Sequence, residues 1–363
     1  MGSWIAEFGS RALLINIRKD QKNQDELAII KNGLSKHSEG AIVYDDLYGE
    51  PDTEQIDSVV YFAKKSHADV IVGYGGIDSF NTAKAVAILA NNSCFAADLL
   101  NGKAKAKKPA LPIITIPIEP TLGEELVPGF TIVDAESGVR KYYDNETIFP
   151  KACFYDPKIS SHLTSDEAAR IGGALLAYAI EVALSIKANP ITSTLILRVI
   201  DLVKKNLNTF YREPDNEKAV TNMLWGSAMT GSSLPSSPLG VTYAVSMALS
   251  TETKLDFHFA LALILPHVME YYLTAAPARY VNIARSLEEN VADISVIEAA
   301  IKAVEGVRRL FLEVNLPSRL SEFDVSKGDL GKLAKLAVTY PHLANAPRQL
   351  TKNEVESILL AAY

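Results

Sequence analysis

A short apolar run, a glycine turn and an alanine-rich stretch follow one another directly in the first half of this sequence. The run is Val70–Val72, the turn is Gly73–Gly76, and the alanine-rich stretch is Ala85–Ala90. This order predicts a buried strand, a tight turn and the N-terminus of a helix. Because the backbone N–H groups and dipole of such an N-terminus can hold a phosphate, the segment predicts an α/β fold of the nucleotide-binding type.

Strand and helix signals alternate through the first 150 or so residues, which indicates a mostly parallel sheet with helices on both faces. The expected strands are residues 11–17, 40–45, 69–74, 112–116 and 130–133, and the expected helices include residues 24–35 and 53–67.

The pattern changes after Asp156-Pro157. Thr164 and Glu167 have the spacing of a capping box, which predicts the start of a helix, and helical patterns then continue to the C-terminus. We therefore predict two domains, a Rossmann-like α/β domain over residues 1–158 and an all-α domain over residues 159–363. A cleft between the two domains is the expected binding site.

The composition excludes several classes of protein. The chain has 363 residues, 48% hydrophobic and 22% charged, with a formal net charge of −7, which is typical of a soluble globular protein. Its basic run, Lys103–Lys108, is too short to predict a nucleic-acid partner. No apolar stretch is long enough to span a membrane. Two isolated cysteines and the lack of a secretion signal at the N-terminus favour the cytoplasm.

Five further segments, in order along the chain, carry a resemblance to a known family. They are Gly75-Gly76, residues 149–157 (FPKACFYDP), Ala179-Ile180-Glu181, residues 264–269 (ILPHVM) and residues 345–351 (NAPRQLT). Together they resemble the iron-containing (group III) alcohol dehydrogenases, with the maleylacetate reductases as the nearest branch. The resemblance implies a dehydroquinate synthase-like architecture, a small-molecule alcohol or carbonyl substrate, a dinucleotide cofactor and a homodimer.

The metal ligands of that family are not matched here. The family holds its divalent metal with an Asp and a His at i and i+4 on one helix and with two further His, so that the metal polarises the substrate oxygen. The corresponding positions are Ala174, Tyr178, Tyr243 and Phe257, and a further family histidine corresponds to Met247. A phenol is a poor metal ligand near neutral pH, because its unperturbed pKa is about 10. We therefore predict that the protein has no catalytic metal.

The cofactor site that the resemblance implies is altered as well. The family has glycine, serine and aspartate where this chain has Ile77, Asp78 and Asn81, and Glu119 and Glu124 replace hydroxyl side chains in a second cofactor segment. The cofactor-binding candidates are Gly75, Gly76, Asp78, Ser79, Thr121 and Arg140.

Three placements of the Asp78 side chain are open: toward the diphosphate, as the cap of the following helix, or in solvent. In the first, a carboxylate about 4 Å from a phosphate charge costs about 4 kcal/mol at an effective dielectric constant of about 20. In the second, the carboxylate occupies the site of the phosphate itself. Because both of these placements oppose a dinucleotide, we expect NAD(P) to bind weakly.

Tyr178, Tyr243 and His258 are the candidate catalytic residues, because a tyrosine can donate a proton to a developing alkoxide. The first hypothesis is a metal-independent oxidoreductase acting on an alcohol or carbonyl compound with NAD(P). A second is a non-redox enzyme that uses the same tyrosines and histidine as acid and base. A third is a non-catalytic homologue that binds a ligand or partner, in which the tyrosines only pack as core. His267, alone in an apolar helical stretch, is expected to be structural.

Overall fold

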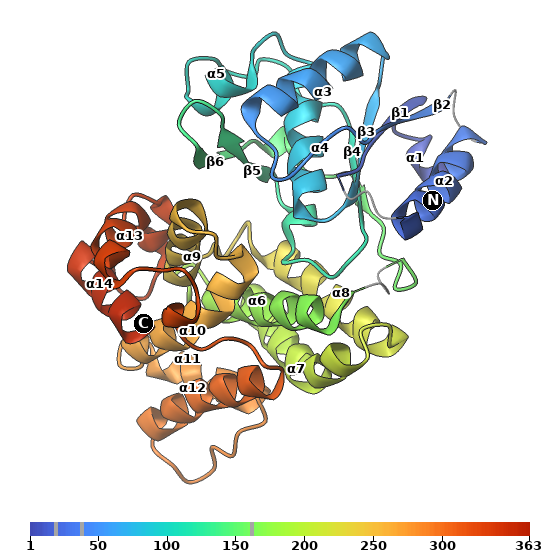
Figure 1. The fold of residues 1–363 in the computed structure, drawn as a ribbon. Helices are drawn as coiled ribbons and strands as arrows, with labels where there is room; N and C mark the ends of the chain where they lie inside the picture. The colour runs from blue at the N-terminus through green and yellow to red at the C-terminus, as the bar shows by residue number, and fades with distance from the viewer. Residues whose placement is uncertain (18–20, 37–39, 160–162) are drawn as a thin grey trace. The chain divides into compact units, whose positions relative to one another are not determined.

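The computed structural model describes residues 1–17, 21–36, 40–159 and 163–363. The chain forms two compact units, Met1–Ser160 and Ser161–Tyr363. The first unit contains a parallel five-stranded sheet in the order β2-β1-β3-β4-β7. The second consists of helices (Figure 1). These observations confirm the predicted α/β fold followed by a helical region.

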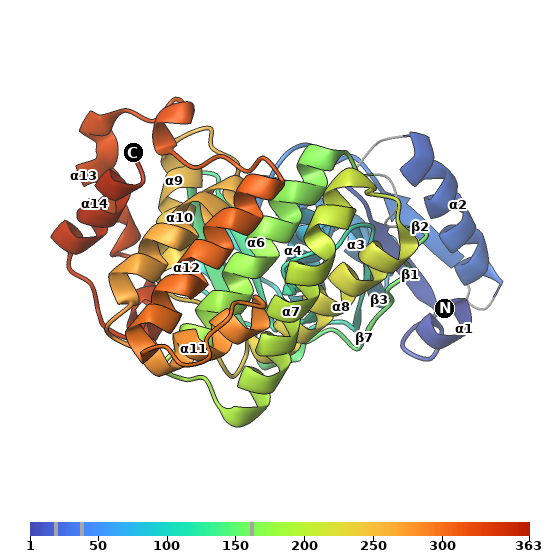
Figure 2. The same cartoon turned by 90° about the horizontal axis from the view of Figure 1, so that it is seen from below.

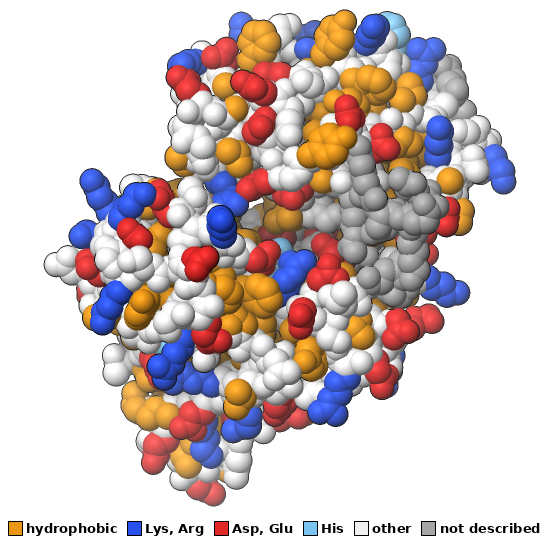
Figure 3. Space-filling model, viewed as in Figure 1, with side chains coloured by type: hydrophobic (Ala, Val, Ile, Leu, Met, Phe, Trp, Pro, Cys, Tyr) orange, Lys and Arg blue, Asp and Glu red, His pale blue; other side chains and the backbone are white. Residues whose placement is uncertain are grey.

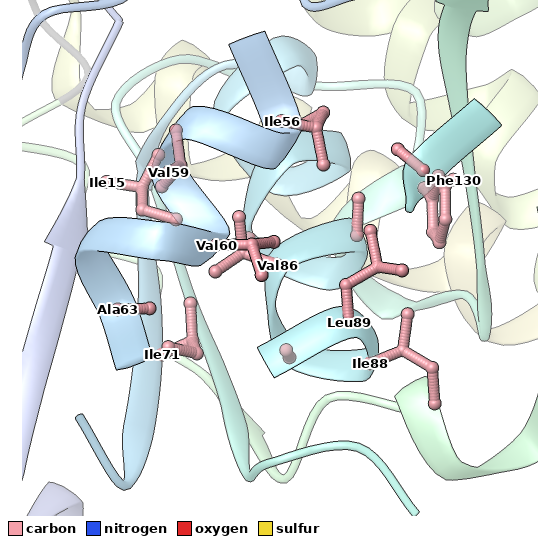
Figure 4. Packing of buried hydrophobic residues seen from close by; sticks show 14 of the residues in the cluster. Ile15, Ile56, Val59, Val60, Ala63, Ile71, Val86, Ile88, Leu89 and Phe130 are labelled. Atoms are coloured by element: carbon pink, nitrogen blue, oxygen red, sulfur yellow. The ribbon is translucent and has the colours of Figure 1, made fainter. Parts of the chain in front are cut away.

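Both faces of the sheet are covered by helices. The strands are β1 (Arg11–Ile15), β2 (Gly40–Tyr44), β3 (Val70–Gly75), β4 (Ile113–Pro117) and β7 (Ala152–Cys153). Successive side chains of a strand point to opposite faces, and the core divides accordingly. Leu13, Ile15 and Ile71 pack in one cluster with α3 (Thr53–Lys65) and α4 (Ile77–Ala90), as Figure 4 shows in part. Leu14 and Val72 pack in a second cluster with α1 (Gly2–Ile5) and α2 (Gln21–Ser35).

One predicted strand lies outside the parallel sheet, and one strand of the sheet was not predicted. Residues 130–133 belong to β5 (Gly129–Asp134), which pairs in an antiparallel hairpin with β6 (Val139–Asp144) and is not a strand of the parallel sheet. β6 carries mostly polar side chains, so it gave no apolar signal that would have revealed the hairpin. The fifth strand of the sheet is β7, and its two residues are too few to show a periodicity.

The second unit is organised around a buried central helix. This helix is α6 (Ser165–Leu184); it begins at the predicted capping box of Thr164 and Glu167 and packs against α7 and α10 (Figure 2). The other helices of eight or more residues are α7 (Pro190–Arg212), α8 (Glu217–Ser233), α9 (Val241–Glu252), α10 (Phe257–Tyr272), α11 (Pro277–Ser286), α12 (Val296–Glu313), α13 (Leu330–Ala337) and α14 (Lys352–Ala361).

The surface carries charges of both signs. On the face in Figure 3, acidic and basic side chains are interspersed and the hydrophobic side chains lie in small groups. In the part of the chain that the structure describes, none of the helices combines the length and the apolar character needed to cross a bilayer.

Candidate functional site

The glycine turn has the local structure that the sequence predicts. β3 ends at Gly75, Gly76 is the N-cap, and α4 begins at Ile77. Gly75 has a φ of 143°, and a Cβ added there would lie 2.4 Å from Oγ of the buried Ser79. Glycine is therefore required at this position for both backbone and packing reasons. The turn presents the N-terminus of a 14-residue helix, which suits a phosphate group.

A carboxylate lies against this turn. A Cβ added at Gly76 would be 2.8 Å from Glu119 Oε1, so the side chain of Glu119 already covers the face of the N-cap residue. Asp78 is the second residue of α4 and adds another negative charge in its first turn. The cap position falls on Gly76, which has no side chain, so Asp78 is not the N-cap residue. The backbone therefore fits a diphosphate, whereas the charge of Glu119 opposes one.

The loop after β4 is held by buried polar groups that the sequence analysis did not single out. Lys84 of α4 is fully buried, and its ammonium group donates to the carbonyl oxygens of Glu124 and Gly129. Burial lowers the pKa of Lys84 to about 8, although Glu124 and Glu125 oppose the shift. Burial also raises the pKa of Glu125, which accepts hydrogen bonds from Tyr155 at 2.6 Å and from the candidate residue Thr121. Lys84 and Thr121 therefore both make hydrogen bonds that hold this loop.

Arg140 lies in the β5–β6 hairpin. Its guanidinium is paired with the carboxylate of Glu50, with Nε 2.5 Å from Oε1 and Nη2 2.6 Å from Oε2. This bidentate arrangement is the geometry that strong Arg–carboxylate pairs adopt. Glu50 thus offsets much of the charge that Arg140 would present to a dinucleotide.

In the second unit, the structure brings together three of the four positions that the resemblance assigns to metal ligands. The ring centroids of Tyr178 and Tyr243 are 5.9 Å apart, and those of Tyr243 and Phe257 are 5.6 Å apart, both in edge-on arrangements. Tyr178 comes from α6, Tyr243 from α9 and Phe257 from α10. Ala174 lies one turn before Tyr178 on α6 and is also buried.

This aromatic cluster has a fourth member that the sequence analysis missed. The ring centroid of His342 is 4.5 Å from that of Tyr243, with an angle of 49° between the rings. Burial lowers the pKa of His342 to about 4, so the imidazole is neutral near pH 7. His342 lies in a short 3-10 helix, Pro341–Asn345. Its sequence signal is no more than its position just before the 345–351 segment that carries the resemblance.

His258, the third candidate catalytic residue, has polar partners of its own. Its Nδ1 is 3.3 Å from Arg170 Nη1 and 3.6 Å from Asp256 Oδ1, and its ring lies beside Phe257. Burial alone would raise the pKa of Asp256, but His258 and Arg170 hold it well below its usual value. The carboxylate of Asp256 also accepts from the N–H groups of His258 and Phe259 and so caps α10. His267 lies further along the same helix, where burial lowers its pKa.

The side chains of the aromatic cluster do not suit a divalent metal. Iron and zinc take imidazole, thiolate or carboxylate ligands, whereas the cluster offers two phenols, a hydrocarbon ring and one imidazole. Over the ranges that the structure covers, no three His, Cys, Asp or Glu side chains are grouped in a way that would hold an ion.

Two family models match nearly the whole chain. Residues 1–157 match the family described as iron-containing alcohol dehydrogenase, and residues 171–363 match the C-terminal part of the Fe-containing alcohol dehydrogenase family. The chain is 26% identical to 1,3-propanediol dehydrogenase of Citrobacter freundii over 371 residues, covering 99% of this chain and 95% of that protein. It is also 26% identical to the NAD-dependent methanol dehydrogenase of Bacillus methanolicus, over 85% of this chain and 81% of that protein. The solved structure of an alcohol dehydrogenase from Oenococcus oeni superimposes with a TM-score of 0.94 at 24% identity, covering 100% and 95%.

Proposed function

Because this chain belongs to the iron-containing alcohol dehydrogenase family, we propose that it is an oxidoreductase that interconverts an alcohol and a carbonyl compound without a bound metal. Relatives named as 1,3-propanediol dehydrogenase and NAD-dependent methanol dehydrogenase support a small alcohol or aldehyde as substrate and NAD(P) as cofactor. As part of the same proposal, the chain acts as a homodimer in the cytoplasm and has no nucleic-acid or membrane partner.

The observation that carries the proposal is the contact between the rings of Tyr178 and Tyr243. A metal in this family would polarise the substrate oxygen as a Lewis acid, and a hydrogen-bond donor aimed at the same oxygen stabilises the same developing charge. Tyr243 is the better candidate, because 8% of its surface is exposed against 1% for Tyr178. Tyr178 then acts by packing edge-on against the ring of Tyr243.

The reduction needs one hydride and one proton. A bound nicotinamide dinucleotide would supply the hydride to the carbonyl carbon. The phenol of Tyr243 donates its proton to the carbonyl oxygen, which becomes the alcohol, and the phenolate recovers a proton from water. The imidazole of His342, 4.5 Å from Tyr243 between ring centroids, is neutral near pH 7, so it does not compete with the phenol as an imidazolium proton donor.

We propose in addition that the dinucleotide binds weakly. Glu119 places its carboxylate against Gly76, and Asp78 adds a charge in the first turn of α4. The N–H groups of α4 still favour a phosphate. The expected result is a dissociation constant well above that of an ordinary dinucleotide enzyme.

The direct test is oxidation of NADH or NADPH with a panel of short aldehydes, using protein whose metal content has been measured and then stripped with a chelator. We expect turnover to survive the chelator and to fall by about 10²–10⁴-fold in Tyr243→Phe. Tyr61→Phe, at an exposed position, is the matched control and should keep its activity. Stoichiometric iron or zinc that is needed for turnover would overturn the proposal. So would turnover without any dinucleotide, or no binding and no turnover at all.

A further inference from the structure

The N-terminus of α9 has no side-chain cap of its own. Its N-cap is Gly240, which offers no oxygen to the first N–H groups of the helix. These groups need an acceptor when they are buried. The helix carries Tyr243 at its third residue, so whatever holds this N-terminus also holds the backbone of the proposed proton donor.

The acceptor comes from a different helix. Glu181 on α6 is buried, with 7% of the residue exposed, and its carboxylate is the acceptor. It accepts from the N–H groups of Gly240 at 3.0 Å, Thr242 at 2.5 Å and Tyr243 at 3.0 Å. Both of its oxygens are used, and one of the three donors is the backbone of Tyr243 itself. A carboxylate is the preferred group here because it also complements the positive end of the helix dipole.

The same helix carries the other tyrosine. Tyr178 and Glu181 are three residues apart on α6 and therefore lie on one face of it. Tyr178 enters the aromatic cluster directly, and Glu181 holds the backbone from which Tyr243 enters it. The 5.9 Å between the two rings is thus set within one rigid helix and one buried group of hydrogen bonds.

The segment that carries His342 is hydrogen-bonded to residues next to the two ends of this arrangement, after α6 and before α9. Asn345 donates from its side chain to the carbonyl oxygen of Leu239 at 2.9 Å, and its own carbonyl oxygen accepts from Ile186 N at 2.9 Å. A cavity of about 10 Å³, no larger than a single water molecule, remains between Glu181, Gly240 and Asn345. The residues around Glu181 are therefore closely packed.

From this geometry we infer that Glu181 is a positioning residue, which places the phenol of Tyr243 for proton donation by holding the N-terminus of α9. The inference rests on the proposed function for its consequence in catalysis. Its structural content, that the carboxylate of Glu181 fixes Tyr243, is tested independently of turnover.

The experiment removes the carboxylate and then returns it as a small molecule. In Glu181→Ala we expect the ring NMR signals of Tyr243, assigned by their loss in Tyr243→Phe, to shift. We expect kcat to fall by about 10²-fold with little change in KM, because misplacement of a reacting group by about 1 Å has an effect of that size. Added formate should restore both the signals and kcat, because it fills the space left by the side chain and carries the same charge. Formamide, with the same shape and no charge, should restore neither.

The control is Leu265→Ala, which removes a buried side chain from the wall of the same cavity. It should lower stability, yet leave the Tyr243 signals in place and show no response to formate. If Glu181→Ala does not fold without formate, Glu181→Gln replaces it and is followed by the Tyr243 signals and kcat alone, because its side chain leaves no space for formate. Unchanged Tyr243 signals in the variant that folds would overturn the inference, as would equal restoration by formate and formamide. A wild-type protein without turnover would refute the proposed function alone, since the Tyr243 signals would still report on Glu181.

Discussion

The imidazole of His342 lies against the ring of Tyr243, with their centroids 4.5 Å apart, and burial lowers its pKa to about 4 from an ordinary value of 6.5. The unfolded chain therefore binds a proton near pH 6.5, while the native protein does not until about pH 4. The contribution of His342 to the free energy of unfolding should be present in full above about pH 6.5. It should be lost as the pH falls from 6.5 to about 4, by about 3 kcal/mol in all.

Urea unfolding at several pH values between 4 and 7.5 measures this loss. In His342→Phe the loss should be smaller by about the same amount, because the variant has no imidazole to protonate. His67→Asn is the control: His67 is exposed and has a φ of 54°, which asparagine tolerates. Equal pH dependence in His342→Phe and the wild type would contradict the prediction.

Glu119→Gln should strengthen dinucleotide binding. The substitution removes the negative charge beside Gly76 and keeps the shape of the side chain. A charge about 4 Å from a phosphate is worth up to about 4 kcal/mol at an effective dielectric constant of about 20, so a gain of about 10-fold to 10³-fold in affinity for NADH is expected. Calorimetric titration of NADH measures it.

Glu136→Gln makes the same change in net charge at an exposed position and should leave the affinity unchanged. An affinity that is the same in Glu119→Gln and in the wild type would show that the carboxylate of Glu119 does not face the diphosphate.

Gly75→Ala should destabilise the first unit by about 1–3 kcal/mol, because it combines an unfavourable φ of 143° with a Cβ placed 2.4 Å from Ser79 Oγ. Gly138→Ala is a matched control at a φ of 67°, where no atom lies within 4 Å of the added Cβ. It should cost less, because only the backbone is strained. Adding Ser79→Ala to Gly75→Ala should recover part of the loss. Denaturant midpoints give all three values, and equal losses at the two glycines would disprove the packing argument.

Four substitutions in the aromatic cluster should create a metal site. Ala174→Asp, Tyr178→His, Tyr243→His and Phe257→His together place one carboxylate and three imidazoles where the aromatic cluster now lies. These are ligands that zinc prefers, so the combined variant should bind zinc in equilibrium dialysis while the wild type does not. In the control, Phe259→His replaces Phe257→His, because Phe259 packs against Phe323 and should not complete the site. Equal zinc binding by both variants would contradict the predicted geometry.

The elements that could be predicted from the sequence are those with a clear local pattern of residues. Strands such as Val70–Gly75 are buried on both faces and read as continuous apolar runs, and the Thr164–Glu167 capping box marked the start of α6. The β5–β6 hairpin and the two-residue β7 were not recognised, because one has a polar strand and the other is too short for a period.

The candidate site was only partly predictable for a different reason. Tyr178, Tyr243 and Phe257 were placed together by resemblance, and the structure gives the distances between their rings. His342 and Lys84 were missed as members of a site, since their surroundings are made by segments remote in sequence. Burial decides whether a lone histidine or lysine carries its charge, and burial at such positions is a tertiary property.

Lys84 holds the backbone of the loop after β4 independently of the loop's own side chains. Its ammonium group ties the carbonyl oxygens of Glu124 and Gly129 to α4 from behind, so the course of the loop does not depend on which side chains the loop turns outward. Side chains that face outward from the loop can then be exchanged while its backbone keeps its path. Ligand preference in this unit is accordingly open to change by single substitutions, with no need to redesign the scaffold.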